Sequence, residues 1–201
     1  FSACGLPAEK HVGVLPLRSF DGRETRDVFL LGLRGLLTAK ARQLARYQES
    51  LCVHNVESPD TASGVGLLFD LRTERAGDSV RLSGTLSNPA SMLPLRRFQM
   101  EADLRQVSSL QDGLPEKFAI LLGFKVSSEA TIAMSSGGTA IRDAFESCLR
   151  GLGQLERGGL DAAIQSLQKA CDLDPFYAPA HAGLGEAYRR KHGLGGDPHW
   201  L

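Results

Sequence analysis

The sequence predicts an α+β domain with a mixed sheet, followed by an all-α segment of helical hairpins. In the first part, short apolar runs and alternating apolar and polar residues, which are typical of strands, surround one long helical pattern. In the last part apolar residues recur at helical spacing, and small residues fall where two antiparallel helices must touch. This order predicts two structural parts joined by a linker.

The composition is that of a folded globular chain without a charge excess. The 201 residues include 23 basic and 23 acidic side chains, and 42% of the residues are hydrophobic. Because the charges balance, we expect no nucleic-acid partner. No apolar run approaches the roughly 18 residues that a membrane-spanning helix needs, so we expect membrane attachment only through segments outside this chain.

The first part contains the pattern of a βαβ unit followed by an antiparallel hairpin. An apolar run closed by Pro16, a long amphipathic stretch and a second apolar run predict parallel strands with a right-handed crossover. Polar and apolar residues then alternate around a turn at 76–78, which predicts a hairpin with one solvated face. The predicted strands span 11–17, 51–56, 65–75, 79–86 and 95–101, and the predicted helices span 28–46 and 110–122.

Three helices are predicted in the last part, at about 139–157, 160–172 and 177–191. Gly158 and Gly159 supply the turn after the first helix, and Pro175 ends the second because proline disfavours helical geometry in the residue before it. We therefore predict about one and a half helical repeats, truncated at the end of the chain. The predicted parts are an N-terminal tail (1–10), an α/β domain (11–126), a linker (127–138) and the repeat segment (139–201).

The small and aromatic residues of the repeat segment fall in one frame. Ala163 and Ala170 lie two helical turns apart and therefore share a face that a partner helix can approach closely. The residues that fit the frame are Gly151, Ala163, Ala170, Pro175, Leu184, Gly185 and Tyr188. In this frame the segment resembles a tetratricopeptide repeat (TPR), a helical hairpin of 34 residues. A generic helical bundle is the alternative.

Several short segments of the first part carry a second resemblance. They are 12–17, 32–33, 76–82, 103–104 and 110–112. Together they resemble a TolB-type amino-terminal α/β domain, which precedes TPR repeats in bacterial multidomain signalling proteins. Segments 182–188 and 197–200 are similar to the C-terminal end of bacterial receptor-type serine/threonine protein kinases. That resemblance implies a cytoplasmic kinase domain and one membrane-spanning helix, with this module outside the cytoplasm.

One departure from the TolB-type pattern concerns the connection between the second and third strands. Relatives carry a helix there, whereas 57–64 offers fewer residues than the roughly ten to twelve of a helical crossover. We expect this helix to be missing or reduced to a turn. One face of the sheet would then be less covered.

The sequence predicts no catalytic, cofactor-binding or metal-binding residues. It contains no glycine-rich phosphate loop, no kinase catalytic motif and no serine-hydrolase elbow, and its cysteines and histidines lack zinc-like spacing. His54 is expected to be a structural histidine in a strand. Cys148 and Cys171 belong to one predicted hairpin, and the sequence leaves open whether they form a disulfide. Cys4 stands in a segment that resembles a bacterial lipoprotein processing site, so lipidation of Cys4 is also open.

In TPR units the first helix faces a peptide-holding groove, and this resemblance assigns the partner-binding residues. In the second unit they are Pro179, Ala182, Glu186 and Arg189, with Arg190 as a further polar contact. In the first unit they are Phe145, Cys148, Leu152 and Leu155. Because the residues of the first unit are apolar, we expect them to pack against the α/β domain or a neighbouring helix. His181 is expected to pack in the core, with a pH-sensitive contact as the alternative.

The resemblances imply a non-catalytic interaction or sensor module of a bacterial membrane-anchored signalling protein, in the first place a serine/threonine protein kinase. Its partner would be a protein or peptide in the TPR groove, and a homodimer is a further expectation. We place the module on the extracytoplasmic side, with a cytoplasmic position as the alternative. Two other interpretations are open. The same module could be attached to a transcription regulator or a nucleotide cyclase, or the chain could be a free-standing envelope lipoprotein anchored through Cys4.

Overall fold

The computed structural model describes residues 6–125, 127–128, 132 and 136–195, and it divides into two compact units. The α/β unit comprises residues 1–25 and 37–136, and the helical unit comprises residues 26–36 and 137–201. Helix α1 (Val28–Ala45) therefore contributes its first turns to the helical unit and its remainder to the α/β unit. The domain ranges proposed from the sequence stay a prediction, because half of the proposed linker, 127–138, lies outside the described residues.

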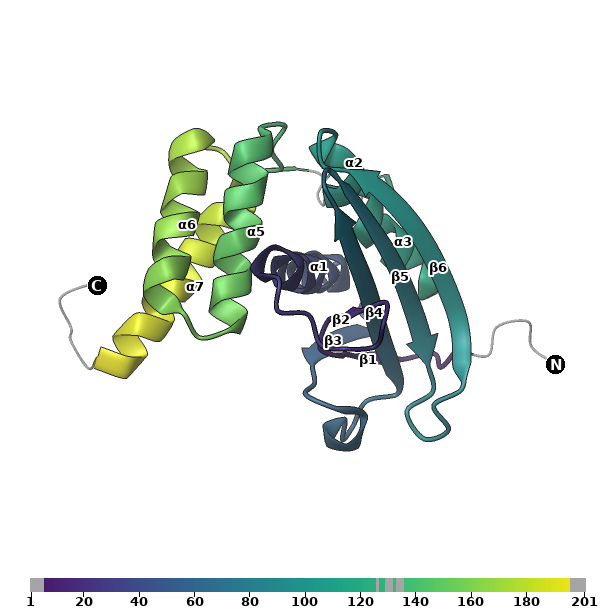
Figure 1. Ribbon diagram of the computed structural model, residues 1–201. Helices are drawn as coiled ribbons and strands as arrows, with labels where there is room; N and C mark the ends of the chain where they lie inside the picture. The colour runs from purple at the N-terminus through teal and green to yellow at the C-terminus, as the bar shows by residue number, and fades with distance from the viewer. Residues whose placement is uncertain (1–5, 126, 129–131, 133–135, 196–201) are drawn as a thin grey trace. The chain divides into compact units, whose positions relative to one another are not determined.

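The α/β unit is built on a six-stranded mixed sheet (Figure 1). Strand β1 is parallel to both of its neighbours, and β5 is antiparallel to both β4 and β6. A two-residue strand, β2 (Arg18–Ser19), pairs with the middle of the sheet. The strands in order across the sheet are β3 (Leu51–Asn55), β1 (Lys10–Val14), β4 (Leu67–Ala76), β5 (Ser79–Ser87) and β6 (Pro94–Asp103). The predicted mixed sheet, with a parallel start and a following hairpin, is confirmed.

One face of the sheet carries the core of the α/β unit. The strand register places Val12 beside Leu67, and both side chains are buried. On the same face Phe69 packs edge-on against Phe118 of helix α3 (Gly113–Leu121), with ring centroids 5.0 Å apart. Edge-to-face aromatic pairs add to the stabilisation that burial provides. This face therefore holds helix and sheet together.

The helix predicted at 110–122 is instead two short helices, α2 (Val107–Gln111) and α3. Pro115 explains the break, because proline has no N–H for the carbonyl four residues earlier and its ring clashes with that carbonyl. Helix α3 begins after Asp112, so Pro115 falls in its first turn. In the first turn no N–H has an intrahelical partner, and proline is tolerated there.

The opposite face of the sheet is only partly covered. The connection from β3 to β4 contains a 3-10 turn, Pro59–Thr61, closed by a capping box between Ser58 and Thr61. The prediction that the crossover helix is reduced to a turn is thus confirmed. A small apolar cluster covers this face locally and consists of Leu15, Val56 and Leu68, with Ala62 and Val65 packed against it.

The helical unit contains the three helices that the sequence predicts. Gly158 adopts a positive φ of 77° in the first turn, and Asp174 is extended ahead of Pro175, which ends the second helix. The helices are α5 (Arg142–Glu156), α6 (Leu160–Leu173) and α7 (Ala178–Gly195). Nowhere in the described ranges is a helix both long and apolar enough to cross a membrane.

The first turns of α1 belong to the helical unit because they pack tightly on α5. A Cβ atom on Gly32 would collide with the carbonyl of Leu149, and one on Gly153 would collide with the carbonyl of Val28. Only glycine lets two helix backbones approach this closely. The helical unit therefore contains, besides the three helices of the last part, the first turns of α1.

Candidate partner-binding surface

The hairpin of α5 and α6 is closed by the small residues that define the predicted repeat. A Cβ atom on Gly151 would overlap the Leu167 side chain, and it would lie 3.2 Å from the carbonyl oxygen of Ala163. Ala163 and Ala170 are fully buried. Any larger side chain at these three positions would push the helices apart. The contacts thus give the physical reason for the small residues in the frame.

The equivalent positions of the second repeat, on α7, are more open. A Cβ atom on Gly185 would have no neighbour within 4 Å, in contrast to its counterpart Gly151. Leu184 is half-buried, and 41% of Tyr188 is exposed. Over the part of the chain that the structure describes, α7 therefore presents this face to solvent.

The partner-binding residues predicted for the second unit all lie on α7. Ala182, Arg189 and Arg190 are exposed, whereas Pro179 and Glu186 are half-buried. Positions 182, 186 and 189 are spaced by four and three residues, so they form one stripe along the helix. Helix α7 brings the predicted set together, while its binding role stays a prediction.

Two arginines hold the carboxylate of Glu186. The Nε of Arg189 donates a hydrogen bond to one oxygen at 2.7 Å, and the Nε of Arg190 donates to the other at 2.6 Å. These bonds, that of Arg189 foremost, lower the pKa of Glu186 to about 2. Arg190 also donates from Nη1 to the carbonyl of Leu155 at 3.1 Å, in the last turn of α5, where carbonyls lack intrahelical partners. Arg189, with 72% of its side chain exposed, is the more accessible arginine.

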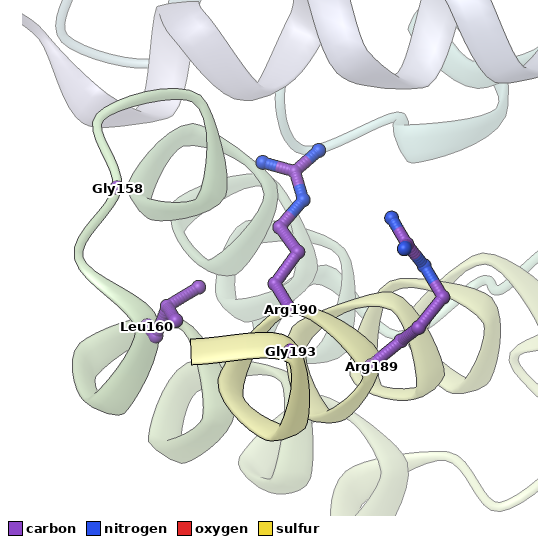
Figure 2. Close-up of a pocket in the computed structure, with 5 residues that line it drawn as sticks. All are labelled: Gly158, Leu160, Arg189, Arg190 and Gly193. Atoms are coloured by element: carbon purple, nitrogen blue, oxygen red, sulfur yellow. The ribbon is translucent and has the colours of Figure 1, made fainter. Parts of the chain in front are cut away.

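A shallow hollow of about 370 Å³ lies beside these arginines (Figure 2). Figure 2 shows both arginine side chains leaving the same turns of α7, near the start of α6 at Leu160. Two guanidinium groups facing one glutamate leave a positive charge at this place, and guanidinium groups bind carboxylates with paired hydrogen bonds. The residues that line the hollow are Gly158, Leu160, Arg189, Arg190 and Gly193.

The apolar groove positions of the first repeat are filled from within the helical unit. Phe145 and Cys148 are fully buried, and 5% of Leu155 is exposed. Leu152 packs on the first turns of α1, where a Cβ atom on Gly35 would lie 3.5 Å from its Cβ. The helix that covers this groove is α1, which the sequence analysis assigned to the α/β domain but whose first turns belong to the helical unit.

An ion pair that the sequence analysis missed joins α1 to α5. Arg34 donates from Nη1 to the Glu156 carboxylate at 2.9 Å, and the two side chains are only 11% and 23% exposed. Nothing in the spacing of two residues so far apart in the chain predicts this contact. Gly32 and Gly35, one turn apart in a predicted helix, were the available signal, because such glycines permit a close helix crossing.

The two cysteines of the hairpin are free thiols in the structure. Burial raises the pKa of the Cys148 thiol to about 12. The Sγ of Cys171 lies 3.6 Å from Nδ1 of His181. His181 is exposed, so the prediction that it packs in the core is wrong. Its Nε2 lies 2.9 Å from the Pro175 carbonyl oxygen, and this contact holds the ring at the surface.

Comparison with known proteins supports the repeat. Residues 154–191 match a family model described as TPR repeat, which confirms the TPR part of the prediction. A TPR repeat is a protein–protein interaction motif without catalytic groups of its own. The α7 residues that we assign to partner binding fall inside the matched range.

A search of curated proteins finds none that matches. Among solved structures, the chain is similar to a PelC dodecamer from Paraburkholderia phytofirmans with one leucine replaced by methionine. That likeness has 12% identity and a TM-score of 0.36, and it covers 67% of this chain and 95% of that chain. A second PelC dodecamer from this organism has 11% identity and a TM-score of 0.35, with 64% and 89% covered. Similarity at this level carries no information about function.

Proposed function

We propose that the chain is a non-catalytic interaction module that binds a protein or peptide segment along α7. The TPR match over residues 154–191 carries this proposal, because the repeat is an interaction motif. Because the groove positions on α5 are buried, α7 is the groove-lining helix with accessible side chains among the described residues. The partner-binding stripe is Pro179, Ala182, Glu186, Arg189 and Arg190.

The charge around the hollow suggests what the bound segment carries. Arg189 and Arg190 share a single carboxylate, Glu186, and border an open hollow. A partner carboxylate placed there would gain charge-assisted hydrogen bonds with at least the exposed guanidinium of Arg189. The proposed ligand is therefore a segment with an acidic side chain or a terminal carboxylate.

The proposed context is a bacterial membrane-anchored signalling protein, in the first place a receptor-type serine/threonine protein kinase, with this module outside the cytoplasm. It is supported by the TolB-type resemblance of the first part and by the order of an α/β domain (11–126) before a TPR segment (139–201). In this proposal the α/β part supplies a second contact or a dimer surface. Altered proximity of subunits would then transmit the signal.

A second candidate is a free-standing envelope lipoprotein. The segment around Cys4, which lies outside the described residues, resembles a lipoprotein processing site and favours this candidate. Membrane partitioning of the full gene product would be lost on Cys4→Ser if the candidate is correct. Unchanged partitioning would remove it.

Affinity capture with matched variants tests the binding role. The tag-bearing chain, immobilised in its wild-type form and as Arg189→Glu, is exposed to an extract of the source cells, and captured proteins are quantified by mass spectrometry. Lys169→Glu is the control, because Lys169 is an exposed cation that lies on α6 and does not belong to the stripe. We expect at least one protein to be captured equally by the wild type and the control. Arg189→Glu should capture at least about tenfold less of it, which corresponds to about 1.4 kcal/mol of binding free energy. Equal capture of every protein by all three forms would refute the site.

A further inference from the structure

We propose that His11, Cys52 and His54 form a zinc-binding site on the less covered face of the sheet. The inference is independent of the partner-binding role of α7. Their ligand atoms, one from each side chain, all lie within 4.8 Å of one another. A thiolate with two imidazoles is a ligand set that zinc prefers.

The strand register explains why the three side chains meet. In the parallel pair of β1 and β3, His11 is the partner of Cys52, so both side chains point to the same face. His54 follows Cys52 by two residues on β3 and points to that face as well. Its Nε2 already lies 3.0 Å from the Cys52 Sγ. Two adjacent strands thus set the spacing, and the ligands sit on a rigid framework.

The residue opposite His54 in the strand pair is Gly13, and side chains of the apolar cluster pack directly above it. A Cβ atom on Gly13 would lie 3.1 Å from the side chains of Val56 and Val65, so the apolar cluster of this face borders the site on one side. His11 and His54 are exposed and Cys52 is half-buried, so an ion can reach them.

The distances fit a tetrahedral ion after small side-chain rotations. With Zn–N near 2.0 Å and Zn–S near 2.3 Å, tetrahedral ligand atoms lie roughly 3.3 to 3.8 Å apart. The Cys52 Sγ and the His54 Nε2 lie 3.0 Å apart, and no two of the three ligand atoms are more than 4.8 Å apart. Shifts of about 1 Å therefore suffice. Changes of that size are within the reach of χ rotations of exposed side chains.

The charge of the site also suits a divalent cation. On binding, Cys52 would give its proton to solvent and bind as a thiolate, while both histidines bind as neutral imidazoles. The Glu9 carboxylate lies 3.7 Å from Nε2 of His11 and supplies a second negative charge. Glu9 would orient His11 or fill the fourth position, which otherwise belongs to water. The bound ion would fasten the edge strand β3 to β1.

Metal titration of the full, tag-free chain tests the site. The chelator-treated, reduced protein is titrated with Zn²⁺ against a chromophoric chelator, and with Co²⁺ to follow the thiolate-to-cobalt charge-transfer absorption. The variants are Cys52→Ser and His54→Asn. His181→Asn is the control, because His181 also lies beside a cysteine, Cys171, but on the helical unit. We expect one ion per wild-type chain, a loss of at least about tenfold in affinity for both site variants, and no change for the control.

Several results would overturn the site. They are the absence of binding at micromolar zinc, equal affinity of Cys52→Ser and the wild type, or a loss of affinity only in the control. If a variant does not fold, the wild type decides by two other measurements. Zinc should protect Cys52 from alkylation, located by peptide mass spectrometry, and cobalt should give the charge-transfer band. Absence of both would also exclude the site.

Discussion

Replacing Gly151 by alanine adds one methyl group where α5 meets α6. A Cβ atom there would overlap Cγ of Leu167 and lie 2.9 Å from its Cδ2 and 3.2 Å from the Ala163 carbonyl oxygen. The Leu167 Cγ is the branch point of its side chain and cannot move without the rest. The two helices must therefore separate, or Leu167 must leave its packed position.

Two opposing terms set the size of the effect. Overpacking a close contact costs about 1 to 3 kcal/mol. Alanine in a helix interior is favoured over glycine by about 0.5 to 1 kcal/mol. We therefore expect Gly151→Ala to lower the free energy of unfolding by about 0 to 2.5 kcal/mol.

Gly185→Ala is the matched variant, because Gly185 holds the same repeat position on α7 with nothing within 4 Å of its added methyl group. The helix-propensity gain then stands alone, and the free energy of unfolding should rise by about 0.5 to 1 kcal/mol. Urea unfolding followed by circular dichroism at constant m-value measures both variants. Because propensity cancels between them, their difference isolates the overpacking at Gly151. Shifts of the same sign and size would show that the hairpin contact is not as described.

Three further predictions concern charges and thiols. Glu156→Gln should lower the free energy of unfolding by about 1 to 2 kcal/mol, because it breaks the partly buried pair with Arg34, and a double-mutant cycle with Arg34→Met should show coupling. The pKa of Glu186 is lowered from its ordinary 4.5 to about 2, so its contribution to stability is present above pH 4.5 and is lost as the pH falls toward 2. The unfolding midpoints of the wild type and Glu186→Gln should therefore differ at neutral pH and converge near pH 2, and a constant difference would contradict this. With chelator present, native alkylation at pH 8 should modify Cys52 but leave Cys148, whose pKa burial raises to about 12, unmodified until denaturant is added.

The elements that the sequence predicted correctly are those with local signals. Pro175 and the Gly158–Gly159 pair mark helix ends through their own backbone preferences, and the frame of small residues reports the contact of helices adjacent in sequence. The same holds for the hairpin of β4 and β5, whose alternation reflects one buried face. The residues of the partner-binding stripe lie on one helix, α7, as the sequence predicted. Their role in binding stays a prediction that the capture experiment tests.

The features that the sequence did not predict depend on contacts between distant residues. The pairing of His11 with Cys52 follows from the register of two parallel strands, and no spacing rule along the chain contains it. The packing of Gly32 on α5 is likewise a crossing of two helices that are separated in sequence by strands β3 to β6. The split of the helix at 110–122 was accessible, because Pro115 limits where a helix can begin.

Hydrogen exchange of the chain with and without its captured partner tests the central claim most directly. The account predicts that bound partner slows amide exchange in peptides from 178–192. Exchange at the exposed positions of α6 and in β5 should stay unchanged. Arg189→Glu at the same concentrations should show no such slowing. Protection confined to the strands of the sheet, or equal protection in the variant, would contradict an interaction module that binds through α7.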